Sequence, residues 1–240
     1  MNKIYIVIPT YNERANIALL INQIFDLNIN DLNILVVDDN SPDGTGLIVE
    51  DLKNKFNNLN ILHRPQKAGL GAAYVAGFKE ALSRGADYIF EMDADFSHDP
   101  KYLPEFLNNI KDFDLVLGSR YITGGGVDNW NLMRRLISRL GNIYARIILF
   151  LPYHDLTGGF KCYRREVLEN IDLDNLNSLG YNFQIETTYK AYKMGFKICE
   201  VPIVFTERKS GQSKFNLGII WESFFKVLQL RYDKKVSGKN

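Results

Sequence analysis

The sequence has few residues of the types that form disulfides or zinc sites. Its 240 residues include two cysteines and three histidines. Cys162 and Cys199 have apolar neighbours and no metal-ligand spacing, so we expect buried, reduced thiols of a cytosolic protein. His63, His98 and His154 also lack the spacing of a metal site, which favours structural roles for them.

Long apolar runs and an excess of one charge are absent as well. No window reaches the roughly 18 uncharged apolar residues of a membrane-spanning helix. The N-terminal apolar run is short, has no cleavage site and ends at Pro9, which argues against a signal peptide. The formal net charge of +1 argues against nucleic acid as a partner. We therefore expect a cytoplasmic protein without a transmembrane domain.

The sequence does contain a regular alternation of strand and helix patterns. Short apolar runs predict strands at residues 3–9, 33–38, 61–62, 88–92 and 114–118. Apolar residues at helical spacing predict helices between them, the first with its apolar positions at Ile17, Leu20, Ile21 and Ile24. This pattern is typical of an α/β fold with a Rossmann-like, mostly parallel sheet flanked by helices on both faces.

The second half of the chain is less regular. We expect a flexible loop at residues 124–126, helices at 132–149 and 182–193, and strands at 160–163 and 196–206. Residues 120–146 carry five arginines, no lysine and a single acid, Asp128. No linker or repeat interrupts the chain. We therefore expect one domain over residues 1–214, followed by an amphipathic helix and basic tail over residues 215–240.

Two carboxylates, Asp93 and Asp95, follow the strand predicted at residues 88–92. Residues at i and i+2 of an extended segment point the same way, so both carboxylates can face one point in space. Mg²⁺ in proteins is typically held by one or two carboxylates together with substrate phosphates. The pair therefore indicates a divalent metal site, the alternative being a turn that ends the strand.

Acid-bearing polar clusters also follow the first and second predicted strands, at residues 10–13 and 38–41. Ligands of open parallel sheets bind outside the carboxyl ends of the strands. The three clusters together predict a nucleotide-sugar and metal site, with helix capping as the alternative for any one of them. An NAD-dependent oxidoreductase would share the strand–helix–strand opening, but Gly-x-Gly-x-x-Gly is missing after the first strand.

Six short motifs, in this order and spacing, carry a resemblance to a known family. They lie at residues 7–14, 36–45, 92–98, 118–121, 155–160 and 208–214. The chain resembles the family-two glycosyltransferases, and among them the dolichyl-phosphate (polyprenyl-phosphate) mannose synthases. The resemblance implies a GT-A fold and metal-dependent, inverting transfer of mannose from GDP-mannose to dolichyl or polyprenyl phosphate, with Mg²⁺ or Mn²⁺. It also implies a short form that binds the cytoplasmic face of a membrane peripherally, by its surface or through a small membrane partner subunit.

The resemblance assigns roles to residues at matching positions. Those expected to bind the nucleotide sugar are Pro9, Tyr11, Glu13, Val37, Asp39, Asp93, Ala94, Asp95, Arg120, Arg208 and Lys214. Asp93 and Asp95 would bind the metal ion. The acceptor phosphate would be received by Arg120, Arg134 and Ser138, so the expected catalytic residues are Asp95, Arg120 and Arg134. Some relatives carry Gln where this chain has Ser97, which we expect to reach a metal ion only through water.

A phosphate acceptor changes what the site has to supply. The second pKa of a phosphate monoester is near roughly 6, so the attacking oxygen is already ionised and needs no general base. Arginines must instead hold a dianion close to a diphosphate, because their planar guanidinium groups bind phosphate bidentately. We expect Arg139 and Arg146 to lie on a solvated helix face, and Glu186 to contact a sugar hydroxyl or support the structure.

Apolar residues recur at helical spacing in the tail, with Arg231, Lys234 and Lys235 after them; the apolar residues are Leu217, Ile220, Trp221, Phe224, Phe225 and Leu228. The helix could pack on the domain, lie in a membrane interface or dock on a membrane partner. Two other functions stay open. One is transfer of glucose from UDP-glucose, or of another sugar, to polyprenyl phosphate, and the other is a non-catalytic lipid-surface module.

Overall fold

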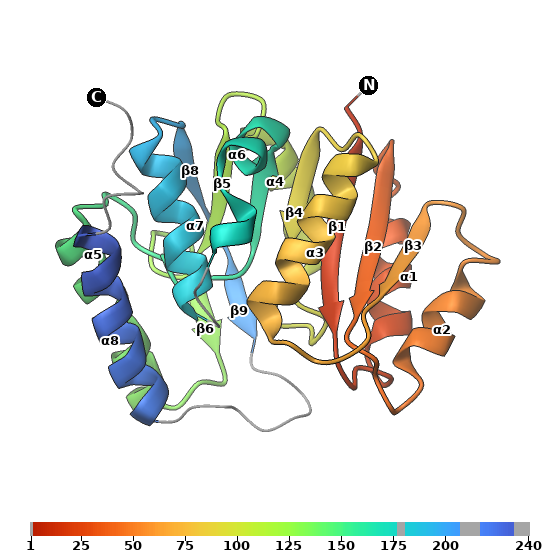
Figure 1. Cartoon of the computed structure of the whole chain (residues 1–240), viewed down its shortest axis with the longest axis horizontal. Coiled ribbons are helices and arrows are strands. Elements are labelled where there is room, and N and C mark those ends of the chain that lie inside the picture. The colour runs from red at the N-terminus through yellow and green to blue at the C-terminus, as the bar shows by residue number, and fades with distance from the viewer. Residues whose placement is uncertain (1, 177–180, 207–216, 233–240) are drawn as a thin grey trace.

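The computed structural model describes residues 2–176, 181–206 and 217–232. Its centre is a seven-stranded sheet in the order β3-β2-β1-β4-β7-β5-β8, and all neighbouring strands are parallel except β7 (Figure 1). The strands are β1 (Ile4–Thr10), β2 (Leu32–Asp38), β3 (Leu59–His63), β4 (Tyr88–Glu91), β5 (Leu115–Ser119), β7 (Lys161–Arg164) and β8 (Ile198–Pro202). The predicted mostly parallel α/β sheet is confirmed.

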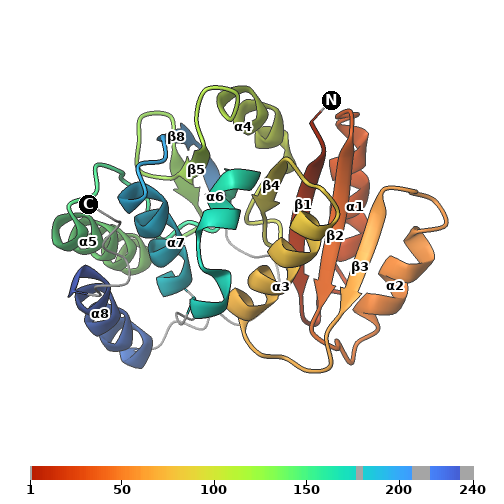
Figure 2. The same cartoon turned by 45° about the horizontal axis from the view of Figure 1, so that its top comes forward.

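Helices cover both faces of the sheet, as the alternation of patterns predicted (Figure 2). One face packs against α1 (Ile17–Asp26), α2 (Thr45–Leu52) and α4 (Leu103–Asn109), and the other against α3 (Leu70–Ser83), α6 (Arg165–Asn170) and α7 (Tyr181–Lys193). Ile17, Leu20, Ile21 and Ile24 of α1 are fully buried, which confirms the apolar face read from their spacing.

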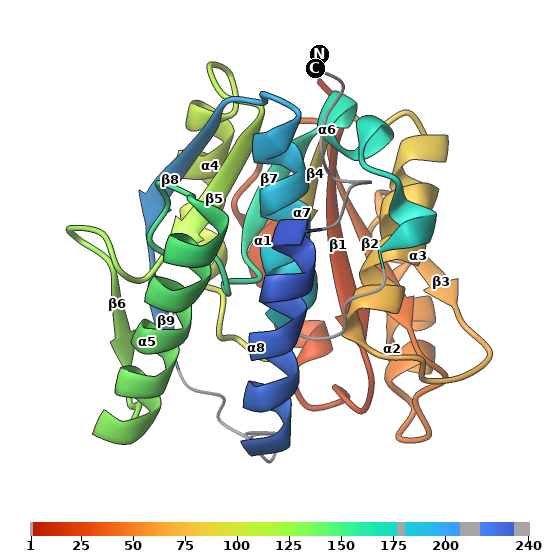
Figure 3. The ribbon, with the colours of Figure 1, turned by 60° about the vertical axis from the view of Figure 1, so that its left-hand side comes forward.

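Two further helices, α5 (Leu132–Leu149) and α8 (Leu217–Tyr232), lie side by side outside α7 (Figure 3). They share a third apolar cluster, in which Leu149 of α5, Tyr189 of α7 and Val227 and Leu230 of α8 are buried. The tail helix therefore packs on the domain through Val227 and Leu230, neither of which belongs to the predicted apolar stripe.

The stripe itself is not the buried face of α8 where its side chains are described. Phe224 and Phe225 are 38% and 63% exposed. The Phe224 ring stacks on Tyr144 of α5 with a centroid distance of 4.4 Å. The remaining stripe side chains from Leu217 to Trp221, and the basic residues Lys234 and Lys235, lie outside what the structure describes. Within the described part of the chain, no helix combines the length and apolarity needed to cross a bilayer.

The strand predicted at residues 196–206 is in fact two strands. After β8 the chain leaves the large sheet at Ile203, and β9 (Val204–Thr206) pairs with β6 (Gly126–Asp128). The chain before β6 passes close to the end of β5, and this close approach requires a glycine at position 125. A Cβ there would lie 2.5 Å from the Ser119 carbonyl oxygen. The sequence did not indicate the break because the apolar run continues from Val201 through Phe205.

Candidate active site

The predicted polar clusters meet at one edge of the sheet, where β1, β2 and β4 end. Thr10 and Asp38, the last residues of β1 and β2, lie opposite each other. The Thr10 hydroxyl donates to the Asp38 carboxylate at 3.0 Å, and the Ser41 amide donates to the same carboxylate at 3.1 Å. These hydrogen bonds fix the Asp38 side chain at the end of β2. The next residue, Asp39, has a different partner.

Asp39 is buried and bridges two loops. Its carboxylate accepts from the Arg64 guanidinium at 2.6 Å, and its backbone N–H donates to the Thr10 carbonyl at 3.0 Å. Tyr11 is partly exposed at the same edge, with the Lys67 ammonium 3.7 Å from its ring centroid. The Tyr11 ring is therefore exposed at this edge, while the buried Asp39 carboxylate is paired with Arg64; an exposed aromatic ring is a group suited to a nucleoside base.

The other residues expected to bind the nucleotide differ in which of their groups reach the edge of the sheet. Glu13 accepts a hydrogen bond from the Asn16 side chain at 2.8 Å, and its backbone N–H donates to Thr45. Pro9 and Val37 are paired across β1 and β2. The Val37 side chain is buried in the core beneath α3, so only its main chain reaches the edge. Arg208 and Lys214 lie outside the described residues.

Asp93 and Asp95 follow β4 directly and are held by different partners. The Tyr74 hydroxyl of α3 donates to Asp93 at 2.8 Å, and burial together with the Asp93 charge raises the pKa of Tyr74 well above its usual value. Tyr74 therefore stays a donor. Asp95 is buried and accepts from the Ser97 backbone N–H at 3.0 Å. Ala94 between them is buried as well.

The surroundings of the two carboxylates fit a hydrated divalent cation. The Ser97 hydroxyl oxygen, two residues from Asp95, is buried and has no hydrogen-bond partner among the described residues, and buried polar atoms of this kind are normally satisfied. A cation with its water shell would supply that partner. Within the described residues, no three His, Cys, Asp or Glu side chains form a metal-binding group. Two carboxylates without a protein cage are what Mg²⁺ uses when substrate phosphates complete its coordination.

His98 connects the carboxylates to an aromatic cluster. Its Nδ1 accepts from the Asp93 backbone N–H at 3.0 Å, and burial lowers its pKa, so the ring is neutral. The ring stacks on Phe160 at 5.0 Å and meets Phe205 edge-on at 5.6 Å. Phe205 in turn meets Trp130 at 5.4 Å. This cluster separates the carboxylates from the arginine-rich part of the chain.

Beneath the carboxylates, a buried polar network joins β4 to α7. The Glu91 carboxylate accepts from Gln184 and, at 3.1 Å, from the Tyr163 hydroxyl. Burial raises the pKa of Glu91 to about 7, even though the positive charge of Lys161 opposes the shift. Burial lowers the pKa of Lys161 to about 8, and its Nζ donates to the Gln184 carbonyl and to two threonine hydroxyls of α7. These bonds fix the strand that presents Asp93.

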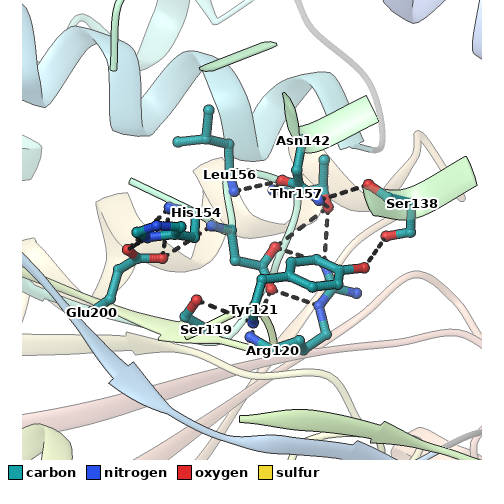
Figure 4. Close-up of polar contacts among 10 residues, drawn as sticks. Ser119, Arg120, Tyr121, Ser138, Asn142, His154, Leu156, Thr157 and Glu200 are labelled. Carbon is teal, nitrogen blue, oxygen red and sulfur yellow. Dashed lines mark hydrogen bonds and ion pairs between the residues drawn. The ribbon is translucent and has the colours of Figure 1, made fainter. Parts of the chain in front are cut away.

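Arg120, directly after β5, is buried in a two-pronged ion pair. Its Nε and one terminal nitrogen donate to the Asp155 carboxylate at 2.6 and 2.7 Å, and the same nitrogen donates to Thr157 at 2.8 Å (Figure 4). Burial by itself would raise the pKa of Asp155, but the charge and hydrogen bonds of Arg120 hold it below its ordinary value. Arg120 thus joins β5 to the loop before β7.

The structure brings the three expected acceptor residues together. The guanidinium carbons of Arg120 and Arg134 lie 5.4 and 4.2 Å from the centroid of the Trp130 ring. Ser138 accepts a hydrogen bond from the Tyr121 hydroxyl at 2.7 Å, and Figure 4 shows Tyr121 beside Arg120. Two guanidinium groups, of which that of Arg120 is already paired with Asp155, and a hydroxyl therefore share one region next to the aromatic cluster, and guanidinium groups are suited to phosphate.

Several residues at the site were not assigned a role from the sequence. Asp155 was only part of a motif, and its pairing with Arg120 spans 35 positions. Tyr74 and Trp130 gave no signal beyond apolar character. Glu186, expected at a sugar hydroxyl or in a structural role, is buried in an ion pair with Lys190 at 2.8 Å.

Comparison with known proteins agrees with this geometry. The model of the family described as glycosyl transferase family 2 matches residues 5–172. A polyprenol monophosphomannose synthase of Mycolicibacterium smegmatis is 46% identical over 226 residues, which are 93% of this chain and 85% of that protein. An undecaprenyl-phosphate mannosyltransferase of Micrococcus luteus is 43% identical over 225 residues, covering 94% of this chain and 92% of that protein.

Solved structures share the fold at low sequence identity. A mycobacterial protein superposes with a TM-score of 0.71 at 17% identity, covering 96% of this chain and 74% of its own. Glucosyl-3-phosphoglycerate synthase of Mycobacterium tuberculosis, in complex with Mn²⁺, UDP and glucosyl-3-phosphoglycerate, gives 0.65 at 16% identity, covering 95% and 78%. The expected GT-A fold is confirmed, and the chain is a glycosyltransferase that belongs to glycosyl transferase family 2.

Proposed function

We propose that this glycosyltransferase transfers mannose from GDP-mannose to a polyprenyl phosphate, with inversion at the anomeric carbon. The observation that carries the proposal is the placement of two groups on either side of one aromatic cluster. Asp93 and Asp95 lie in the loop after β4 on one side, and Arg120 and Arg134 lie against Trp130 on the other. A donor diphosphate and an acceptor phosphate need such an arrangement of acids and arginines. The mannose-transferring relatives at 46% and 43% identity support the same choice of substrates.

A divalent cation, Mg²⁺ or Mn²⁺, is part of the proposal. Asp93 and Asp95 would hold it, and the Mn²⁺ of the structurally similar synthase supports this. When bound, the cation neutralises negative charge on the leaving diphosphate. The protein positions the carboxylates through Tyr74 and His98, which bind the side chain and the main chain of Asp93.

The acceptor needs orientation more than activation. Its phosphate is ionised near neutral pH, so no side chain has to remove a proton. Arg134 and Ser138 on α5 would hold the phosphate, while Arg120 carries positive charge in a position fixed by Asp155. Holding the attacking oxygen in line makes the transfer effectively unimolecular, which lowers its barrier.

The experiment that tests the proposal combines purified protein with nucleotide-sugar donors and short polyprenyl phosphates. We expect transfer of label from GDP-mannose into the organic phase, dependent on Mg²⁺ or Mn²⁺ and lost in excess EDTA. Preference for UDP-glucose would replace the donor in the proposal. Failure of every donor, with polyprenyl phosphate or without it, would leave a non-catalytic lipid-surface module as the better account.

Replacement of Arg134 by glutamine should weaken use of the acceptor far more than binding of the donor. Loss of one charge-assisted hydrogen bond typically costs about 1.5–3 kcal/mol, so the acceptor concentration at half-saturation should rise about ten- to a hundredfold. Arg135→Gln is the matched control, because Arg135 is an exposed neighbour that donates to the Val127 carbonyl. Separate titrations of donor and acceptor measure the effect. A larger loss of donor affinity would place Arg134 at the wrong phosphate.

An exposed apolar face of α5 extends the proposal to the membrane. Six large side chains on one side of this helix are between 43% and 81% exposed: Leu132, Met133, Leu136, Leu140, Ile143 and Ile147. A patch of this kind marks an interaction surface. Arg135, Arg139 and Arg146 border it, and arginines beside an apolar helix face suit a bilayer with anionic lipids. We propose that α5, more than the tail helix, attaches the enzyme peripherally to the cytoplasmic face of a membrane.

Replacing Leu136 and Leu140 by serine together should lower binding to anionic vesicles by at least tenfold. Full burial of a leucine contributes about 1.5–3 kcal/mol, and each 1.4 kcal/mol is tenfold in affinity. The control pair is Leu19→Ser with Leu47→Ser, since these leucines are 55% and 73% exposed on α1 and α2. Vesicle sedimentation compares the two. Equal losses, or none, would mean that this face serves a protein partner such as a small membrane subunit.

A further inference from the structure

A small cavity lies beside the proposed acceptor site, on the side of α5 that faces the loop before β7. Its volume is about 140 Å³, and its lining residues are Tyr121, Arg139, Asn142, Ile143, Arg146 and His154. Space for a few water molecules suits one small anionic group and excludes a nucleotide sugar. Asn142 closes the floor, because its amide bonds the Thr157 hydroxyl and the Leu156 backbone N–H.

Two arginines, Arg139 and Arg146, place positive charge in the lining of this cavity. Arg139 and Arg146 are two helical turns apart and therefore lie on the same side of α5. Neither makes an ion pair with any residue that the structure describes. The nearby acid, Glu200, is already engaged by the His154 ring at 2.9 Å and by the backbone N–H groups of His154 and Asp155. Arg120, in contrast, has its charge matched by Asp155.

The cavity also has a defined place relative to the exposed apolar face of α5. With 3.6 residues per turn, Arg139 and Arg146 fall at one border of that face, whereas Tyr144 and Ile148, which pack toward the third apolar cluster, fall at the other. Ile143 belongs both to the apolar face and to the cavity lining. With this face on a bilayer, the cavity opens at the level of the lipid phosphates.

We propose that this cavity binds the phosphate group of a membrane phospholipid, in addition to the polyprenyl phosphate held at Arg120, Arg134 and Ser138. The inference rests on the proposed membrane attachment through α5. Arg139 and Arg146 would grip the phosphate oxygens, since guanidinium groups bind phosphate in bidentate fashion. Ile143 would meet the adjoining lipid chain. A headgroup bound here would orient α5 so that the acceptor site faces the membrane surface.

The test uses Arg139→Gln and Arg146→Gln in the full chain, with Arg135→Gln as the matched control. Binding is measured by sedimentation with two kinds of vesicle that contain no polyprenyl phosphate. One contains phosphatidylglycerol in a phosphatidylcholine matrix. The other is a galactolipid vesicle given the same surface charge by an anionic carboxylate lipid. Inorganic phosphate is titrated separately against the melting temperature without lipid.

We expect each cavity variant to lose about tenfold in affinity for the phospholipid vesicles and little for the carboxylate vesicles. Arg135→Gln removes a border arginine outside the cavity, so its loss should be small and equal on both vesicles. If all three variants lost affinity equally, or if the loss were the same on both kinds of vesicle, general attraction between positive and negative charge would explain the binding. That result would overturn the proposal. Millimolar phosphate could instead raise the melting temperature in a way that depends on Arg139, while the variants bind vesicles like wild type. The cavity would then bind a free anion, and the proposal of a lipid phosphate would be wrong. Transfer of mannose to a short soluble acceptor is followed in parallel, so that failure of the proposed function is seen independently.

Discussion

Substitution of Asp95 by asparagine should reduce sugar transfer by at least about a thousandfold while leaving the fold intact. The change keeps the shape of the side chain and its ability to accept from the Ser97 backbone N–H, but it removes the charge that would hold the divalent cation. A thousandfold loss corresponds to about 4 kcal/mol of transition-state stabilisation, a magnitude that a metal ion typically supplies.

The measurement is a steady-state assay with GDP-mannose at several Mn²⁺ concentrations, beside circular dichroism and thermal melting. Asp99→Asn is the matched control, because Asp99 is also an acid of this loop but is partly exposed to solvent at the turn, where it accepts from the Lys101 backbone N–H and pairs with the Lys101 ammonium. Direct Mn²⁺ binding, followed by electron paramagnetic resonance, should weaken in the Asp95 variant alone. Activity within a few-fold of wild type would sink the metal assignment, whatever the melting curves show.

Substitution of Arg120 by methionine should both destabilise the protein and impair transfer. Asp155 would then be left buried without its cation, and breaking a buried ion pair in this way costs about 3–5 kcal/mol. The double variant Arg120→Met with Asp155→Leu should recover at least half of the lost stability, because no buried charge remains. If Arg120 also holds phosphate, transfer should stay low in the double variant.

The pH dependence of the free energy of unfolding tests whether the unpaired Asp155 carboxylate causes the loss of stability. In the wild type, Arg120 depresses the pKa of Asp155, so the stabilisation is present above the ordinary carboxyl range and is lost as the pH falls through the depressed value. In Arg120→Met, burial should raise that pKa instead. The free energy of unfolding of the single variant should therefore approach that of wild type as the pH falls from 7 toward about 4. A stability difference that does not change with pH would show that the carboxylate is not the source.

The sheet could be predicted from the sequence because its strands are short apolar runs with little ambiguity. β1, β2, β4 and β5 were each placed within a residue or two of their positions. Prediction failed where apolar character continues through a change of partner, as at Ile203 between β8 and β9. It also did not identify which face of α8 is buried, because exposed Phe224 and Phe225 are as apolar as buried Val227 and Leu230. The spacing of apolar residues in a sequence shows which side chains could be buried. Which of them are buried depends on the element that packs against them.

The site was predictable to a different degree. The two carboxylates after β4 were identified from the sequence, and their shared direction stays a prediction. The strand ends at Glu91 and the chain bends from residue 94, so the i, i+2 rule for extended segments does not by itself fix where Asp95 points. The partner of Arg120 was not identified from the sequence, since Asp155 is brought to it only by the antiparallel insertion of β7. Arg139 and Arg146 were expected on a solvated helix face. Arg139 is exposed, but the fold adds the loop with His154 and turns that side of the helix into a cavity wall.

The hydrogen bonds of Asn142 would make the proposed acceptor site sensitive to the position of α5 in the bilayer. This buried residue ties the middle of α5 to the loop that carries Asp155 and Thr157 through three hydrogen bonds, so a displacement of the helix would pull on the loop. A tilt of α5 caused by lipid packing or curvature would thus be transmitted to Arg120 as a displacement of its counter-ion. The turnover of the enzyme would then depend on the mechanical state of the bilayer as well as on the concentration of acceptor in it.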